Sequence, residues 1–126
     1  MGDTFDDLFI EKEELNKDIL KKILTGKVKL INDGNIIFQK VFQPKHSIIL
    51  YLLSNKIFLM KKIKEKEADG PREIHLKTGV PEGTVKRYVR ELEKEGLLIR
   101  TEGGYYVPNH ALIKIEKIME ENDRRD

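Results

Sequence analysis

The segment from Pro44 to Lys66 carries apolar side chains on nearly every side of the helix that it would form. These apolar residues are Ile48, Ile49, Leu50, Leu52, Leu53, Ile57, Phe58, Leu59, Met60 and Ile63. A helix that is apolar all round is a buried helix. Ser54-Asn55-Lys56 interrupts the run, so one long helix and two abutting pieces both fit it, and we favour a helix broken or bent near Ser54. The lysines of its end, Lys61, Lys62, Lys64 and Lys66, are expected to project into solvent.

The size and composition of the chain set limits on its class. A length of 126 residues suits one domain with an appendage and can bury one modest core. The absence of cysteine excludes disulfides and thiolate metal sites, and it fits a reducing cytoplasm. The longest unbroken apolar run, Ile48 to Leu53, is far shorter than the roughly 20 residues of a membrane span. No signal-peptide pattern is present, so we expect a soluble cytoplasmic protein without membrane contact.

Charge is distributed unevenly along the chain. Six acids and one lysine give residues 1–14 a net charge of −5, so the remainder, in a chain of net charge +2, carries +7. A basic body with an acidic tip suggests that the body binds a polyanion. Residues 1–10 also contain Phe5, Leu8, Phe9 and Ile10, and they fit either a mobile tail or a short segment that docks on a partner protein.

An N-terminal extension, residues 1–43, is expected to combine a helix and a β-hairpin. Leu15, Ile19 and Ile23 fall at helical spacing within residues 12–24, and Gly26 supplies the stop. Two β-favourable runs, 28–31 and 36–41, flank Asn32-Asp33-Gly34-Asn35. Asp-Gly between such runs is a strong hairpin signal.

Four further elements are predicted after residue 68. Pro71 opens a short helix that ends at Gly79, and Pro81 opens a second helix that ends at Gly96. Runs 98–101 and 105–107, joined by a Gly-Gly turn, predict a second hairpin. Asn109 can cap a last helix with an apolar stripe formed by Leu112, Ile115, Ile118 and Met119. That stripe fits packing on its own domain or pairing with a second subunit, and we favour the second subunit.

Enzymatic sites are not indicated. His46, His75 and His110 lie far apart without metal-ligand spacing, and the acids follow helical charge patterns. Gly103-Gly104 lacks the Lys-Ser/Thr of a phosphate-binding loop, and no serine lies in a nucleophile-elbow context. We therefore expect a protein that is not an enzyme and has no cofactor and no metal.

The helix predicted at residues 81–95 has two distinct faces. Val85, Val89 and Leu92 share a core face with Tyr88 at its margin. The opposite face gathers Gly83, Arg87, Arg90 and Lys94, with Lys86 at its edge. Like charges four residues apart, such as Lys86 and Arg90, repel mildly. A helix selected only for stability would carry acids at such positions, so the basic stripe suggests an anionic binding partner.

The stretch from Lys56 to Pro108 resembles a winged helix-turn-helix domain of a prokaryotic or archaeal transcriptional regulator. The features that carry the resemblance are "EI…TGV", "GTV" at the start of the next helix, "LEKEGLL" at its end, and the hairpin with Gly-Gly at its tip. The resemblance implies an α+β, mostly helical fold. In this family the second helix of the pair enters the DNA major groove, the first crosses the backbone, and the wing touches phosphates or the minor groove.

The resemblance assigns DNA contacts by position. It implies that Thr84, Lys86 and Arg87 read base edges and that Arg90 and Lys94 meet phosphate. It further implies backbone contacts from Arg72, Lys77 and Arg100. His75 departs from the family pattern, which has a small residue where the two helices approach closely. A histidine at this position predicts a wider or rotated packing of the two helices, or a local shift in the alignment of this stretch with the family pattern.

We therefore expect a winged helix-turn-helix at residues 44–108, preceded by the extension 1–43 and followed by a C-terminal helix, 109–126, that could dimerise. The predicted function is sequence-specific binding of double-stranded DNA by a homodimeric, nucleoid-associated transcriptional regulator. The alternative is a winged helix that binds protein within a transcription or replication assembly. The N-terminal extension could serve either dimerisation or docking to another protein.

Overall fold

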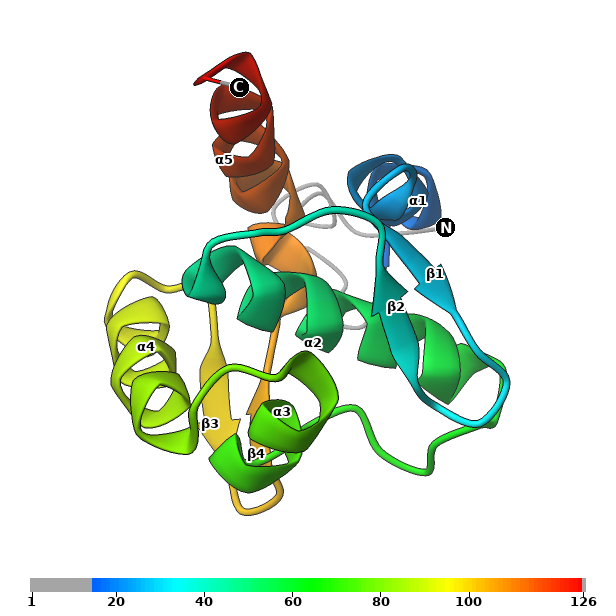
Figure 1. Ribbon diagram of the computed structural model, residues 1–126. Helices are drawn as coiled ribbons and strands as arrows, with labels where there is room; N and C mark the ends of the chain where they lie inside the picture. The colour runs from blue at the N-terminus through cyan, green and yellow to red at the C-terminus, as the bar shows by residue number, and fades with distance from the viewer. Residues whose placement is uncertain (1–14, 126) are drawn as a thin grey trace, which may run out of the picture.

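The computed structural model describes the backbone of residues 15–125 and the side chains of residues 15–121. Over this range the chain is α+β and mostly helical, as predicted (Figure 1). The helices are α1 (Lys17–Leu24), α2 (Pro44–Met60), α3 (Pro71–Thr78), α4 (Glu82–Lys94) and α5 (Leu112–Arg125), and a 3₁₀ turn, η2 (Asn109–Ala111), leads into α5. The strands β1 (Val28–Leu30) and β2 (Ile36–Phe38) form one antiparallel hairpin, and β3 (Ile99–Thr101) and β4 (Gly104–Tyr106) form another. The expectation for residues 1–10 lies outside the described residues.

Helix α2 runs without interruption through Ser54, so the predicted break is wrong. The Ser54 hydroxyl donates to the Leu50 carbonyl at 2.8 Å, which satisfies it inside the helix. Asn55 and Lys56 are buried as well and bond to groups outside α2. The polar triplet Ser54-Asn55-Lys56 is therefore part of a continuous helix, and its side chains are buried like the apolar ones.

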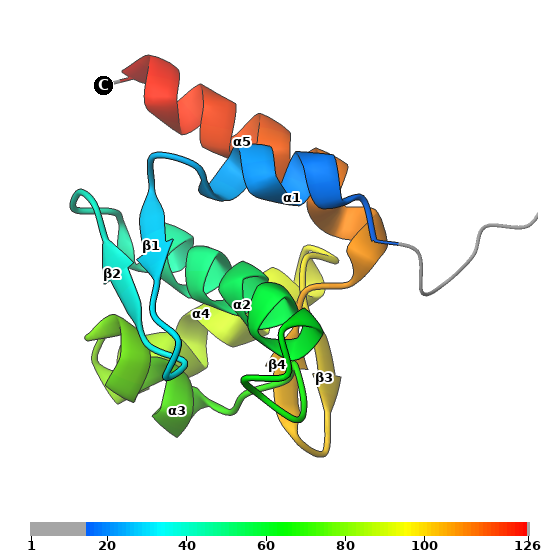
Figure 2. The same ribbon diagram turned by 90° about the vertical axis from the view of Figure 1, so that its right-hand side faces the viewer.

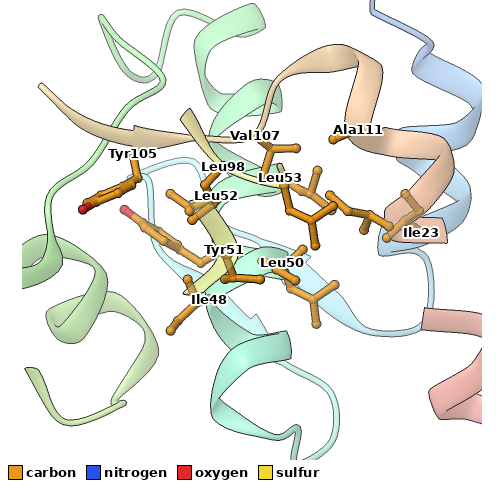
Figure 3. Packing of buried hydrophobic residues seen from close by; sticks show 14 of the residues in the cluster. Ile23, Ile48, Leu50, Tyr51, Leu52, Leu53, Leu98, Tyr105, Val107 and Ala111 are labelled. Atoms are coloured by element: carbon orange, nitrogen blue, oxygen red, sulfur yellow. The ribbon is translucent and has the colours of Figure 1, made fainter. Parts of the chain in front are cut away.

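One hydrophobic core joins the elements around α2. Figures 1 and 2 show α1 and α5 on one side of α2, with α3, α4 and the β3–β4 hairpin on the other. Leu52 and Leu53 of α2 meet Leu98 and Val107, which flank the β3–β4 hairpin, in the packed interior of Figure 3. Leu20, Ile23 and Val28, from the N-terminal extension, belong to the same buried cluster.

Helix α5 covers the chain's own core. Its stripe residues Leu112, Ile115 and Met119 are at most 2 % exposed, and Ile118 packs against them. Helix α1 lies alongside α5 in Figure 2. Lys22 of α1 pairs with Glu116 of α5 at 3.2 Å, which raises the pKa of the lysine. The stripe is thus occupied within the chain, and our preference for a second subunit at this stripe is corrected.

Local signals set the ends of several elements. Asn16 caps α1 by accepting from the Ile19 N–H at 3.1 Å, so the described helix begins at Lys17. Both predicted hairpins form, with Leu30 opposite Ile36 and Thr101 opposite Gly104 at their turn ends. After α4, the Leu97 N–H donates back to the Leu92 carbonyl, and the Leu97 side chain is buried.

Candidate nucleic-acid interface

Helix α4 presents one buried face and one cationic face. Val85, Val89 and Leu92 are at most 1 % exposed and attach the helix to the core. Arg87, Arg90 and Lys94 are exposed. The apolar spacing predicted this division into two faces, and the structure confirms it.

The acids beside this face have cationic partners of their own. Lys45, at the start of α2, pairs with Glu95 at 2.7 Å and lies 3.8 Å from Glu91. Lys86 lies 3.5 Å from Glu82 on the same helix. By contrast, neither Arg90 nor Lys94 has a carboxylate within ion-pair distance among residues 15–121. The charges of Arg90 and Lys94 on the exposed face are therefore uncompensated within this part of the chain.

Arg87 is held against its neighbour. Its guanidinium lies 4.8 Å from the Tyr88 ring centroid and donates to the Tyr88 hydroxyl at 3.1 Å. A weak contact of 3.9 Å also joins it to Glu91. Its side chain is still 68 % exposed, so the contacts orient the guanidinium while leaving it accessible.

A positively charged hollow lies between α4 and the β3–β4 hairpin. Its volume is about 330 Å³, and its lining includes Lys86 and Arg90 of α4 and Arg100 of β3. Gly70 and Pro71, at the N-terminus of α3, close its far side, and Glu102 contributes one acid. Residues from three elements are thus brought together around a space that suits an anionic group.

A crossing of two backbones fixes the hairpin beside this hollow. The Asp69 and Tyr105 main chains exchange hydrogen bonds of 3.1 and 2.7 Å and form a β-bridge. At Gly104, φ is +122° and a side-chain Cβ would lie 2.1 Å from the Asp69 carbonyl carbon. Only glycine fits such an approach, so this residue sets the position of the hairpin.

The other predicted contact residues lie apart from the hollow. Thr84 is half-buried on α4, and Arg72 is exposed on α3. Lys77 donates to the Asn35 side chain of the β1–β2 turn at 2.6 Å. Its ammonium therefore joins α3 to the β1–β2 turn, and the contact of Lys77 with the nucleic-acid backbone stays a prediction.

His75 has a structural partner at the turn between α3 and α4. Its Nδ1 lies 2.7 Å from the Val80 carbonyl oxygen, and because a carbonyl only accepts, Nδ1 donates. The same turn carries a bond from the Val80 N–H to the Thr78 hydroxyl at 3.2 Å. His75 therefore closes the loop that joins the two helices, a role that its position in the sequence does not reveal.

A buried polar cluster escaped prediction. Tyr51, Asn55 and Lys64 all donate to one Asp69 oxygen, at 2.5, 2.9 and 2.5 Å. Burial and the neighbouring Asp69 raise the pKa of the Tyr51 hydroxyl, so it remains a donor. Lys64 was expected in solvent, and this is corrected: its side chain is 20 % exposed and turns inward to the carboxylate.

A second buried pair adjoins this cluster. Lys56 is 3 % exposed, and its ammonium donates to Glu67 at 2.5 Å and to Asn109 at 2.7 Å. These bonds tie α2 to the loop before α3 and to the turn before α5. The polar triplet inside an apolar helix was the sequence signal for both sets of contacts.

Searches for similar proteins found no matching family model, no matching curated protein and no matching solved structure. Within residues 15–125, no helix combines the length and apolar character of a membrane span. Among the described side chains, those of residues 15–121, no group of three histidine or acidic residues is arranged to hold a metal ion.

Proposed function

We propose that this chain binds double-stranded DNA, with α4 as the recognition helix in the major groove, and that it acts as a homodimeric transcriptional regulator. The order α2, α3, α4, β3, β4 is the order that the winged helix-turn-helix resemblance implies. The β-bridge at Asp69 adds a short extended segment to the hairpin, which supports the same interpretation. The proposed interface comprises the α4 face with Arg87, Arg90 and Lys94 and the adjoining hollow.

The observation that carries the proposal is the pair of exposed cations on α4, Arg90 and Lys94, that have no carboxylate partner among residues 15–121. A helix kept only for stability gains from acids interleaved among its bases. Here Glu95 pairs with Lys45 of α2, and Glu82 and Glu91 contact Lys86 and Arg87, whereas Arg90 has no carboxylate partner among residues 15–121 and lines the hollow with Arg100. A phosphate at the hollow and base edges beside Arg87 would supply the missing negative charge.

The test measures duplex binding by fluorescence anisotropy over a series of salt concentrations. We expect Arg87→Ala with Arg90→Ala to weaken binding at least about 30-fold and to reduce the salt slope by about 1 to 2, because each lost arginine contact contributes about 1–3 kcal/mol. The matched control is Lys62→Ala with Lys117→Ala, which removes the same charge from exposed positions after α2 and on α5. Equal duplex affinity in the arginine variant and the parent protein would refute the proposal.

The homodimer needs a surface other than the α5 stripe, which the core already uses. Ile113, on the outer side of α5, is 58 % exposed and remains accessible. Selection of bound sequences from a random duplex pool tests the symmetry directly, since a twofold dimer selects a palindrome. A motif without twofold symmetry, together with a monomeric mass in sedimentation, would contradict the dimer.

A further inference from the structure

A long apolar groove lies between α1, β1 and the C-terminal part of α2. Two adjoining hollows of about 390 and 470 Å³ share Leu30 and Ile57 in their linings. Leu20, Leu24 and Met60 extend the floor along α1 and α2. Figure 2 shows β1 leading from the end of α1 down along one side of α2. The groove is thus formed by the N-terminal extension on one side and by the central helix on the other.

Every charged residue in the lining of the groove is a lysine. These residues are Lys17, Lys21, Lys29 and Lys61. Among residues 15–121, none of the four has a carboxylate within ion-pair distance. By contrast Lys22, next to Lys21 but on the other side of α1, pairs with Glu116 and Glu120. Among the described residues, acids therefore lie on the α5 side of α1 and none lines the groove.

The groove also leaves apolar surface accessible. Met60 is 42 % exposed, and Ile31, in the lining of the second hollow, is 39 % exposed. A segment that complements this surface needs apolar side chains toward the floor and acids toward the lysines.

Residues 1–14, which precede the described part of the chain, have this chemistry. They hold six acids against one lysine. Phe5, Leu8 and Phe9 are spaced so that they share one face of a helix, with Asp6 and Asp7 on the remainder. We propose that the groove binds residues 1–14 of the same chain, with the phenylalanines on the apolar floor and the carboxylates at the lysine rim.

The attachment point makes an intramolecular contact feasible. Lys17, the first residue of α1, itself lines the groove, so the preceding segment starts at its edge. Fourteen residues reach about 46 Å when extended, whereas the eight residues of α1 rise about 12 Å. A short tether also gives an effective concentration in the millimolar range, so a modest intrinsic affinity suffices.

The contact has a consequence for the charge distribution of the molecule. The groove lies by the C-terminal end of α2, whereas α4 pairs with Lys45 at its N-terminal end (Figure 1). A filled groove therefore holds the six acids away from the cationic face of α4.

The absence of cysteine allows a direct test by paramagnetic relaxation. The 126-residue chain with Thr4→Cys carries a nitroxide, and amide peaks in a ¹⁵N spectrum report on residues near it. We expect peaks from Leu24, Leu30 and Met60 to lose most of their intensity while those of Arg100 and its hairpin keep theirs. Charge reversal by Lys21→Glu with Lys29→Glu should restore the groove peaks, and Lys114→Glu with Lys117→Glu should not.

Three results would overturn the proposal. The first is unchanged intensity at the groove, and the second is broadening that persists after reversal of Lys21 and Lys29. The third is broadening that arises only when spin-labelled protein is mixed with separately isotope-labelled protein, which would place the segment on a second molecule. The spectrum verifies that each variant folds, and no DNA is present, so the outcome is independent of the duplex-binding test.

Discussion

Replacing Asp69 by alanine tests whether the buried polar cluster holds the fold together. Its carboxylate is 8 % exposed and accepts from Tyr51, Asn55 and Lys64 at one oxygen. The substitution removes the charged acceptor that the three groups share, and it leaves the Lys64 ammonium with only two neutral acceptors, the Tyr51 hydroxyl and the Asn55 amide oxygen. Because Asp69 also joins its backbone to Tyr105, the loss acts at the contact between α2 and the hairpin.

The expected magnitude follows from burial. Removing one partner of a buried ion pair typically costs 3–5 kcal/mol, because the other charge is left without compensation. The Lys64 side chain is 20 % exposed and can swing toward water, so the lower end applies, about 3 kcal/mol. For a chain of this size that corresponds to a fall of about 12 °C in Tm.

Urea unfolding followed by circular dichroism measures the change in the free energy of unfolding. The control is Glu65→Ala, an exposed acid in the same loop, which should change it by less than about 0.5 kcal/mol. Adding Lys64→Met to Asp69→Ala should recover part of the loss, since it removes the stranded charge. A loss below about 1 kcal/mol for Asp69→Ala alone would show that the cluster contributes little to stability.

Three further substitutions test single contacts. Gly104→Ala should destabilise the protein by at least about 3 kcal/mol in the same assay, because φ is +122° and backbone blocks the Cβ, whereas Gly103→Ala meets only a flexible lysine end. His75→Ala should cost about 1 kcal/mol by leaving the Val80 carbonyl without its donor, and an unchanged free energy of unfolding would contradict that role. In the β1–β2 turn the Asp33 carboxylate accepts a hydrogen bond from the Asn35 backbone N–H, which lowers the pKa of Asp33. The contribution of this carboxylate to stability is therefore present above its unfolded-state pKa and is lost as pH falls through its folded-state pKa. Asp33→Asn should therefore reduce the loss of stability in acid, and an identical acid limb would refute this.

Local features of the fold were predictable because their causes lie within a few residues. The Asp33-Gly34 turn, the Gly79 helix stop and the core face of α4 all depend on near neighbours in sequence. The unbroken α2 was not predictable in this way, because Lys56 and Asn109 are 53 residues apart. The hydrophobic periodicity of the sequence shows that polar residues interrupt the apolar run, but it does not identify the residues that they bond to.

The candidate site divides along the same line. Residues on the exposed face of α4 could be named from helical spacing alone, whereas the meeting of Arg90 with Arg100 depends on where the hairpin lies. Lys77 shows the converse, since its spacing suits a surface contact but the β1–β2 turn brings Asn35 to it. The partner of the α5 stripe was likewise undetermined, because an apolar face packs equally well on its own core or on a second chain.

The position of Arg100 links the buried cluster to the proposed interface. Arg100 stands opposite Tyr105 in the β3–β4 hairpin, and Tyr105 bonds to the Asp69 backbone, whose side chain is anchored to α2. A change at Asp69 therefore reaches the cationic hollow through the hairpin without removing any cation. If the hollow binds a phosphate, Asp69→Asn should weaken duplex binding while leaving its salt slope close to that of the parent, because the number of cations is unchanged. A reduced slope would instead mean that Arg100 has left the interface altogether.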